Sequence, residues 1–444
     1  MHEKIVVAVD IGTSQITAVA ARKNERVILS VLAVETVKSE DCVLRGRIYN
    51  VGEVTSKIEE LISSLEKKTG ATIERMYVGV GGQSVRSIPH IVARELEEET
   101  PVSQKLLDDM LEECLNHEPE GITLLGTCAP EYIINGRHEQ KPKGVICQKI
   151  EAQYPLIVGR LSYEKDLTSV EKNSGIDIEG KIPSIEAVAK AVLTPTEKDS
   201  GCILIDFGAG TTEAAIYKKD ILRFYTTLPV GSDAITKDLV SLNMTEEVAE
   251  TFKTTQGEAT STEAQKENQV IEARTDEILT NIIAQVRNAG FEAIPAEGVV
   301  ITGGGAKLKG LVESMQDRMK CKVRMACPQD TLFIREVLLT SSPQYAQIAG
   351  LLALAEKNCV VVTAEKPQVE QPKLFEDSVL VNKPISQPTK LEKPQVSTEQ
   401  PGDTQPPKEV KPKNNVFRGL IDKVEKKVNG ISGSLFGDDD FDNA

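Results

Sequence analysis

Residues 5–14 read Ile-Val-Val-Ala-Val-Asp-Ile-Gly-Thr-Ser, and residues 203–212 read Ile-Leu-Ile-Asp-Phe-Gly-Ala-Gly-Thr-Thr. In each stretch an apolar run ends in Asp-x-Gly, and a second apolar run follows, at residues 16–21 and 214–217. This pattern predicts a strand, a tight turn and an antiparallel return strand. One such turn would indicate only a way out of a sheet. Two copies with the same spacing, about one domain length apart, predict a duplicated architecture.

The two turns have the composition of phosphate-binding loops. Short turns that contain glycine let consecutive backbone amides point into one concavity, and Thr and Ser add hydroxyl donors. An aspartate at the end of the strand can face a divalent cation through bound water. Two copies that face each other would hold the phosphate tail of a nucleotide from both sides.

A third glycine-rich turn comes later in the chain. An apolar run at residues 298–302 leads into Gly303-Gly304-Gly305 and then into a helical pattern. Three glycines would let a flat base lie against the backbone, where a β-carbon would collide with it. A strand-to-helix turn without a ligand explains the same residues, and the GK[ST] ending of a P-loop is missing. The position after two phosphate loops favours a nucleotide base.

The composition excludes several classes of protein. The 444 residues are enough for two or three domains, and 40% of them are hydrophobic, which predicts globular domains with real cores. A net charge of −15 argues against nucleic-acid binding, because neutralising phosphates needs clustered Lys and Arg. The cysteines lack CxxC spacing and the histidines lack ligand spacing, so we expect reduced thiols in the cytoplasm and no zinc site. We expect neither a signal peptide nor a membrane-spanning run, so any membrane contact would be peripheral.

The amino-acid composition of the chain changes after about Val362. Before it, alternating strand and helix patterns predict an α/β body with mixed sheets. Residues 363–413 are rich in proline and poor in apolar residues, which predicts a disordered linker. Residues 414–436 follow a helical pattern, and residues 437–444 form an acidic tail expected to stay in water.

The pattern at residues 414–436 is amphipathic. Basic residues on the polar side, among them Arg418 and Lys423, are typical of a helix that lies in an anionic lipid interface. Docking into the groove of a partner is the alternative. The apolar stripe expected to contact lipid consists of Phe417, Leu420, Ile421, Val424, Val428, Ile431 and Leu435.

The order of the three glycine-rich elements, phosphate, phosphate and then adenosine, resembles the actin-like ATPase superfamily. Within it, Met76-Tyr77-Val78-Gly79-Val80-Gly81-Gly82-Gln83-Ser84-Val85 resembles the strand and turn that lead into the extra subdomain of the bacterial cell-division protein FtsA family. Residues 129–132, 142–144, 270–274 and 301–304 agree with the same family. The resemblance spans the body, and the linker with its terminal helix extends it to the end of the sequence.

The resemblance implies an actin-like ATPase fold, in which two lobes with mixed β-sheets flanked by helices enclose a nucleotide cleft. Subdomain 1A would comprise residues 1–85 and 164–195, and the inserted, SHS2-like subdomain 1C would comprise residues 86–163. Subdomain 2A would comprise residues 196–240 and 297–360, and subdomain 2B residues 241–296.

The family pattern also assigns candidate site residues for ATP and Mg²⁺. Glu250 and Lys253 match the ribose-binding pair of the superfamily, although a solvated pair three residues apart on a helix gives the same pattern. Arg274 lies in the segment that receives the C-terminal peptide of the tubulin-like FtsZ in this family. Asp10 and Asp206 would face Mg²⁺ through water. The remaining residues expected to contact ATP are Gly12, Thr13, Ser14 and Gln15, then Gly208, Ala209, Gly210, Thr211 and Thr212, and Gly303, Gly304, Gly305 and Ala306 beside the adenine.

The catalytic position departs from the superfamily pattern. Actin-like hydrolases place a Glu or Gln between the lobes to orient the attacking water. Here Ser184 and Ile185 occupy the aligned Glu/Gln-Pro positions, and Glu186 follows as the candidate catalytic residue. Glu213 stands where many relatives carry Asp. We therefore expect a weak ATPase at most.

The function implied by the resemblance is an ATP-binding protein that forms filaments and anchors FtsZ to lipids at the division site, on the cytoplasmic face of the membrane. Subdomain 1C would contact other division proteins. Three other actin-fold functions stay open: a PilM-like platform protein of a pilus or secretion system, a sugar-kinase-type phosphotransferase and a DnaK-type chaperone. The linker and terminal helix have no purpose in a sugar kinase, and a chaperone would need a folded substrate-binding domain in their place.

Overall fold

The structure, a computed structural model, describes residues 3–260, 265–291, 293–334 and 336–361. The predicted linker, membrane-targeting helix and acidic tail lie outside the described residues, and so do all the residues expected to contact lipid. Within the described ranges, no helix combines the length and the apolar character that crossing a membrane requires.

Lobe 1 is built on a five-stranded sheet. Its strands β13, β7 and β1 run parallel to one another, and β2 and β3 continue the sheet antiparallel to their neighbours. The predicted hairpin is confirmed, since β1 and β2 pair from Lys4 and Lys23 to Ile11 and Ile16. In sheet order the strands are β13 (Asp177–Pro183), β7 (Arg75–Val80), β1 (Lys4–Ile11), β2 (Gln15–Lys23) and β3 (Ile28–Lys38).

Lobe 2 repeats this arrangement strand for strand. Two parallel strands precede the central strand and two antiparallel strands follow it. The second hairpin closes between Phe207 and Thr212, which leaves a four-residue turn, as between Ile11 and Ile16. The predicted duplication is thus confirmed. In sheet order the strands are β18 (Val323–Met325), β17 (Val299–Thr302), β14 (Cys202–Phe207), β15 (Thr212–Lys218) and β16 (Ile221–Leu228).

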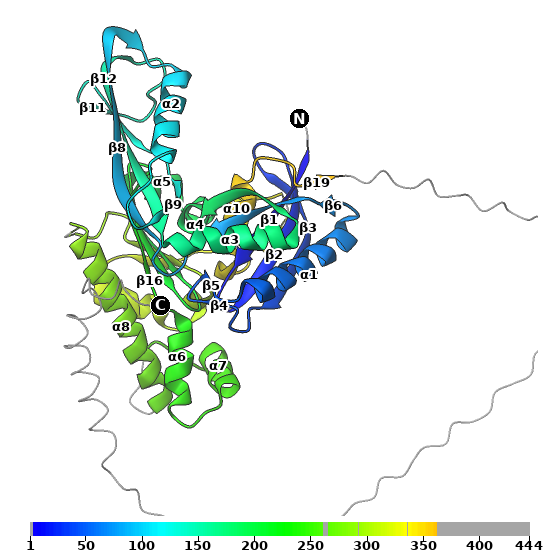
Figure 1. Cartoon of the computed structure of the whole chain (residues 1–444). Helices are drawn as coiled ribbons and strands as arrows, with labels where there is room; N and C mark the ends of the chain where they lie inside the picture. The colour runs from blue at the N-terminus through cyan, green and yellow to red at the C-terminus, as the bar shows by residue number, and fades with distance from the viewer. Residues whose placement is uncertain (1–2, 261–264, 292, 335, 362–444) are drawn as a thin grey trace, which may run out of the picture. The chain divides into compact units, whose positions relative to one another are not determined.

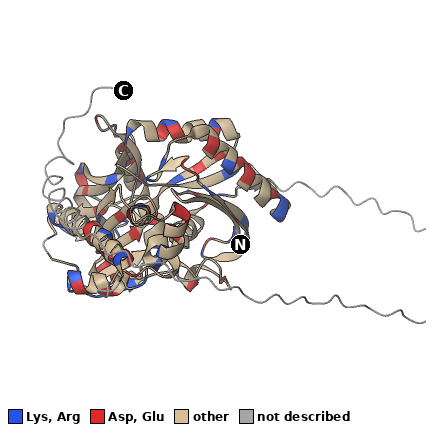
Figure 2. Ribbon diagram, turned by 90° about the horizontal axis from the view of Figure 1, so that it is seen from below, with Lys and Arg blue, Asp and Glu red and all other residues tan. Residues whose placement is uncertain are grey.

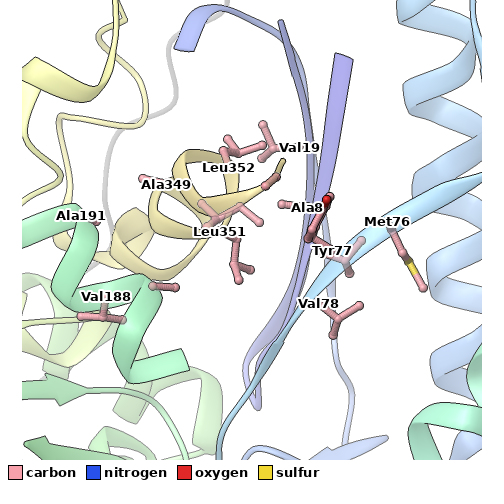
Figure 3. Close-up of a cluster of buried hydrophobic side chains, with 14 of the residues drawn as sticks. Ala8, Val19, Met76, Tyr77, Val78, Val188, Ala191, Ala349, Leu351 and Leu352 are labelled. Carbon is pink, nitrogen blue, oxygen red and sulfur yellow. The ribbon is translucent and has the colours of Figure 1, made fainter. Parts of the chain in front are cut away.

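Two helices carry the chain from one lobe to the other, α4 (Ser184–Val192) and α10 (Ala346–Leu354). Figure 3 shows Leu351 and Leu352 of α10 against the lobe 1 sheet, with Val188 of α4 on the other side. The helices approach closely because residue 350 is glycine, and a β-carbon there would collide with the carbonyl oxygen of Ala187.

The faces of β14 belong to different cores, because successive side chains of a strand point to opposite sides. Cys202 and Leu204 join the core that contains lobe 1 and the two crossing helices. Ile203, Ile205 and Phe207 join the core beneath the remaining helices of lobe 2. Both sheets therefore rest on the same pair of central helices.

The other helices cover the outer faces. On lobe 1, α1 (Val51–Thr69) and α3 (Leu161–Ser174) pack together. The side chain of Asn50 accepts a hydrogen bond from the amide of Glu53 at the start of α1, and Gly70 ends the helix in a left-handed conformation. Lobe 2 carries α5 (Pro195–Ser200), α6 (Ser232–Val240), α7 (Glu246–Thr255), α8 (Lys266–Asn288) and α9 (Leu311–Met319). Figure 2 shows basic and acidic residues interspersed along the helices.

An inserted subdomain interrupts lobe 1 between β7 and α3. Its long strands β8 (Arg86–Pro101) and β12 (Ile146–Gly159) pair antiparallel and form the blue-to-cyan arm in Figure 1. The arm has its own core, which includes Val92, Met110 and Tyr154. It joins lobe 2 through the pairing of Arg86 with Thr226 of β16. Its other elements are α2 (Gln104–Leu115), β9 (Thr123–Thr127), β10 (Glu131–Ile134) and β11 (Arg137–Glu139).

Short elements complete the described chain. The strand pair β4 (Val43–Leu44) and β5 (Arg47–Ile48) lies before α1, and β6 (Thr72–Ile73) pairs with β19 (Val360–Val361). Three 3₁₀ turns, η1 (Gly304–Lys307), η2 (Asp330–Leu332) and η3 (Pro343–Tyr345), lie in lobe 2 or on the way to α10.

Candidate functional site

A cleft of about 480 Å³ lies between the two lobes, a volume typical of small-molecule sites. Both hairpin turns, the Gly303–Gly305 turn, α7 and the start of α6 line it. The cleft contains every residue expected to contact ATP except two. Thr212 is buried behind its turn, where its hydroxyl donates to the carbonyl oxygen of Val230 at 2.8 Å, and Ala306 lies in the lobe 2 core.

The two hairpin turns have the same internal hydrogen bond. The amide of Gly12 donates to the carbonyl oxygen of Gln15 at 3.1 Å, and the amide of Gly208 donates to the carbonyl oxygen of Thr211 at 3.0 Å. A β-carbon on Gly12 would lie 2.8 Å from the Gln15 oxygen, and one on Gly208 would lie 3.0 Å from the Thr211 oxygen. The repeated sequence pattern is therefore a repeated backbone conformation that needs glycine at the same place.

The tips of the two turns meet across the cleft. A β-carbon on Gly210 would lie 2.5 Å from the hydroxyl oxygen of Thr13, which itself accepts a hydrogen bond from the amide of Gly46 at 2.8 Å. The second turn is also fixed from behind, because the amides of Ser232 and Asp233 at the start of α6 donate to its carbonyl oxygens at 3.0 and 2.9 Å. Both turns thus line one cleft, and their tips are in contact.

Three carboxyl groups line the cleft: that of Glu213 is buried, and those of Asp10 and Asp206 are half-buried. Burial and the charge of Asp206 raise the pKa of Asp10 to about 7, and burial raises the pKa of Asp206 to about 6. Burial and the charge of Asp206 raise the pKa of Glu213 to about 8, against smaller opposing effects of the Gly82 amide and the Tyr225 hydroxyl. One carboxyl oxygen of Glu213, Oε2, is buried and makes no hydrogen bond of normal geometry.

A cation would relieve the mutual repulsion of these carboxylates, so they suit a divalent metal ion. The described residues contain no group of three or more His, Cys, Asp or Glu side chains placed to ligate a metal directly. Carboxylate groups can also contact a hydrated cation through its water molecules.

Glu250 and Lys253 lie on α7 and line the cleft, but they differ in exposure. The buried ammonium of Lys253 donates to the carbonyl oxygen of Ser232 at 3.2 Å and to the hydroxyl of Thr236 at 2.8 Å, and lies 2.7 Å from Glu250. Its three protons are therefore used within the protein, where they hold α7 against α6. The carboxylate of Glu250 is half-exposed and is the member of the pair that is open to a ligand.

The Gly303–Gly305 turn departs from the expected helix start. After β17 the chain first forms the 3₁₀ turn η1, and α9 begins only at Leu311. Gly303 has a φ of +89°, and a β-carbon on it would collide with Asp206 Oδ1. Residue 304 is open, since its nearest neighbour would be Gln344 Cβ at 4.0 Å. Glycines with these conformations are poor helix formers, which explains the delayed helix.

Comparison with known proteins identifies the chain's relatives. The family model described as "Cell division protein FtsA" matches residues 203–350. The FtsA of Porphyromonas gingivalis is 27% identical over 336 residues, which cover 70% of this chain and 70% of that protein. The FtsA of Streptococcus pneumoniae is 26% identical over 458 aligned positions, which cover 95% of this chain and 98% of that protein.

The chain is therefore similar in sequence to FtsA proteins over most of its length. A solved "PilM-PilN type IV pilus biogenesis complex" superposes with a TM-score of 0.57 at 15% identity, covering 78% of this chain and 97% of that one. At that identity the similarity concerns the fold alone. Together with the duplicated sheets, it gives this chain the actin-like ATPase fold expected from the sequence.

The predicted catalytic residue Glu186 is not among the residues that line the cleft. The thiol of Cys128, in the inserted subdomain, donates to the carboxylate of Glu186 at 3.8 Å, and burial raises the pKa of Glu186. Ser184 lines the cleft instead. Two residues along a helix turn by about 200°, so the two side chains leave opposite sides of α4.

Arg274 also lies outside the cleft, on α8. Its guanidinium makes two hydrogen bonds with Asp238 of α6, at 2.6 and 3.0 Å, and one with Glu277 at 2.6 Å. A ligand of this arginine would therefore have to share it with two carboxylates that already bind it.

Gln347 and Tyr163 are two of the cleft residues that were not predicted from the sequence. Gln347 donates from Nε2 to Asp10 Oδ1 at 2.8 Å, and the hydroxyl of Tyr163 accepts from the amide of Gly81 at 3.0 Å. Gln347 is the single polar residue in the otherwise apolar helix α10, and that signal could have identified it. Nothing in the sequence around Tyr163 distinguishes it from a core tyrosine.

Proposed function

We propose that this chain is an FtsA-type cell-division protein that binds Mg²⁺ and ATP between its lobes, assembles into filaments and attaches FtsZ polymers to the cytoplasmic membrane. The observation that carries the nucleotide site is the pair of equivalent glycine turns that meet across one cleft. The similarity to FtsA proteins supports the role in division.

The cleft residues divide the work of binding ATP. Amides and hydroxyls of residues 12–15 and 208–211 bind the triphosphate from opposite sides. Asp10 and Asp206 hold the hydrated Mg²⁺, which neutralises phosphate charge. Glu250 accepts hydrogen bonds from the ribose, and the open backbone at Gly304 lies against the adenine. Lys253 keeps Glu250 in place.

Hydrolysis is slow in this proposal. Ser184 occupies the cleft side of α4, where a longer Glu or Gln would be needed to orient water, and Glu186 faces away. ATP then acts mainly by closing the lobes and favouring assembly. Identical subunits that join through two different faces extend into filaments.

Membrane attachment comes from the helical pattern at residues 414–436. One amphipathic helix binds anionic lipid only modestly, but a filament presents many helices together, and the linker sets their effective concentration. This places the protein on the cytoplasmic face of the membrane at the division site. The inserted subdomain is the surface for other division proteins.

The nucleotide site is tested by calorimetric titration with ATP in the presence of Mg²⁺. We expect binding that weakens at least about tenfold in Gly210→Val, because the new side chain occupies the place where the two turns meet. Gly52→Ala on α1 is the matched control, since its nearest neighbour would be Asn50 Oδ1 at 3.6 Å. An unaltered affinity in Gly210→Val would contradict the site.

The FtsZ site is tested with a C-terminal FtsZ peptide and two variants. Arg274→Ala removes the guanidinium, whereas Asp238→Ala removes its main partner and leaves only Glu277 bound to it. If Arg274 receives the peptide, the first variant loses binding and the second keeps or gains it. Equal losses in both would show that only the contact between α6 and α8 matters. No binding by the parent chain would favour a PilM-like role.

A further inference from the structure

The inserted subdomain is rooted at the floor of the cleft. Its first strand, β8, begins at Arg86, directly after the turn of residues 81–85 that ends β7. Its last strand, β12, ends at Gly159, and the side chain of Arg160 then donates from Nε to the hydroxyl of Ser84 at 3.0 Å. Both strands of the arm in Figure 1 therefore meet at this turn, which we call the root turn.

Two side chains that line the cleft hold the root turn. The amide of Gly81 donates to the hydroxyl of Tyr163 at 3.0 Å, and the amide of Gly82 donates to Glu213 Oε1 at 3.1 Å. Tyr163 belongs to lobe 1, whereas Glu213 reaches across from β15 of lobe 2. The Glu213 bond thus links the second lobe to the base of the inserted subdomain.

The root turn has no space in which to absorb a movement of Glu213. A β-carbon on Gly81 would lie 2.6 Å from Glu213 Oε1 and 2.6 Å from Ser184 Oγ. Gly82 has a φ of +97°, and its β-carbon would lie 2.5 Å from the carbonyl oxygen of Gly46. Because packed contacts of this kind do not deform continuously, a shift of the carboxylate must break the bond or move the turn.

The position of Glu213 is also where the two hairpins differ. Glu213 pairs with Asp206 across the second hairpin, and Thr17 pairs with Asp10 at the equivalent place in the first. Only the second hairpin carries a side chain there that is long enough to cross to the other lobe and also acidic. Its Oε2 is buried and makes no hydrogen bond of normal geometry, and the Tyr225 hydroxyl and the carboxyl of Asp206 interact with the Glu213 side chain.

We propose that Glu213 is a positioning residue that couples the cleft to the inserted subdomain by exchanging one partner for another. Without a ligand it binds the Gly82 amide and holds the root turn. When Mg²⁺ and ATP are bound, its carboxylate turns to the hydrated cation and releases Gly82, so the base of β8 and β12 becomes freer to move. The proposal rests on the nucleotide site proposed above.

Hydrogen exchange measured by mass spectrometry tests this coupling in the full-length chain. In the parent protein, Mg²⁺ with ATP should slow exchange at residues 12–15 and 208–211 and speed exchange at residues 81–85 by about threefold or more. ATP with EDTA in place of Mg²⁺ should leave residues 81–85 unchanged, because the exchange of partners needs the cation.

Two substitutions separate the charge of Glu213 from its reach. Glu213→Asp keeps the charge but is one methylene too short for Gly82, so the root turn should exchange fast with and without ligand. Glu213→Gln keeps an acceptor for Gly82 but has no charge for the cation, so the turn should exchange slowly in both states. Tyr163→Phe is the control, since it loosens Gly81 yet should preserve the response to Mg²⁺ and ATP.

The possible failures are distinguishable. If residues 12–15 and 208–211 do not respond to Mg²⁺ and ATP in the parent chain, the proposed nucleotide site is wrong. If they slow while residues 81–85 stay unchanged or slow as well, the nucleotide site stands and the coupling is overturned. A ligand response in Glu213→Gln equal to that of the parent chain would also overturn it.

Discussion

The three glycines of the Gly303–Gly305 turn serve different purposes. Gly303 has a φ of +89° and no room for a β-carbon beside Asp206, whereas Gly304 faces open space. We expect Gly303→Ala to destabilise the ligand-free protein by more than about 1 kcal/mol, through backbone strain and collision. Gly304→Ala should leave the melting temperature unchanged.

Affinity measurements complete this prediction. Gly304→Ala should weaken ATP binding about tenfold or more, since its methyl group occupies the surface expected to receive the adenine, while inorganic triphosphate should bind as before. If Gly304→Ala binds ATP normally, the adenine lies elsewhere. If it also melts early, the turn is more constrained than the open space around it indicates.

The carboxyl groups that line the cleft predict how stability depends on pH. The pKa values of Asp206, Asp10 and Glu213 are raised to about 6, 7 and 8, from ordinary values of 3.8, 3.8 and 4.5. The folded protein therefore holds these protons more tightly than the unfolded chain, and their contribution to stability is lost as pH rises through 6 to 8. Ligand-free protein in EDTA should have a lower urea midpoint at pH 8 than at pH 6.

Glu213→Gln isolates one part of this effect. The variant has no proton to lose at this position, so the decline of its urea midpoint between about pH 7 and pH 8.5 should be shallower than that of the parent chain. Parallel curves for the two proteins would show that Glu213 does not titrate in this range. Mg²⁺ with ATP should flatten the parent curve, because a cation favours the ionised carboxylates.

At the scale of elements, the crossing of α4 and α10 has the least room for change. A β-carbon on Gly350 would collide with the carbonyl oxygen of Ala187. Gly350→Ala should therefore cost about 1–3 kcal/mol, because the helices must separate to accommodate the methyl group. Gly52→Ala on α1 is the matched control and should stabilise by up to about 1 kcal/mol, since alanine favours a helix and has room there.

Urea unfolding measures both changes in the free energy of unfolding, which should fall in Gly350→Ala and rise in Gly52→Ala. Because the crossing also fixes the angle between the lobes, Gly350→Ala should weaken ATP binding as well as lower stability. Normal stability in Gly350→Ala would mean that the two helices can slide apart freely.

The sequence predicts elements better than it predicts contacts between them. Both hairpins follow from apolar runs around Asp-x-Gly, because strand and turn are set by neighbouring residues. The bond between Glu213 and Gly82 joins residues 131 positions apart, and that between Gln347 and Asp10 joins residues 337 apart. No local pattern encodes either, since each depends on how the lobes close.

The candidate catalytic residue shows a different limit. Ser184 and Glu186 are near neighbours in the sequence, and their chemistry alone favours the glutamate. The start of α4 at Ser184 decides between them, because the helix turns the two side chains in opposite directions. A shift of two residues along a helix is therefore enough to place a side chain on the face away from the cleft.

At the scale of the molecule, the two lobes and the inserted subdomain all adjoin the cleft. The chain crosses between lobes only through α4 and α10 among the described residues, and the inserted subdomain leaves from the cleft floor. A nucleotide in the cleft therefore touches both lobes and lies next to the root of the arm. This arrangement suits a protein in which ATP controls assembly more than chemistry.

Membrane attachment should depend on the cleft if assembly supplies avidity. In liposome flotation with anionic lipids, the full chain should float, whereas a chain ending at Val362 and the variant Val424→Glu should not, because the first lacks the apolar stripe and the second places a charge in its middle. Gly210→Val keeps that stripe but is expected to lose ATP, so it should float only at high protein concentration, where single helices bind by mass action. Flotation of Gly210→Val that matches the parent chain at every concentration would show that one helix suffices and that the cleft does not control attachment.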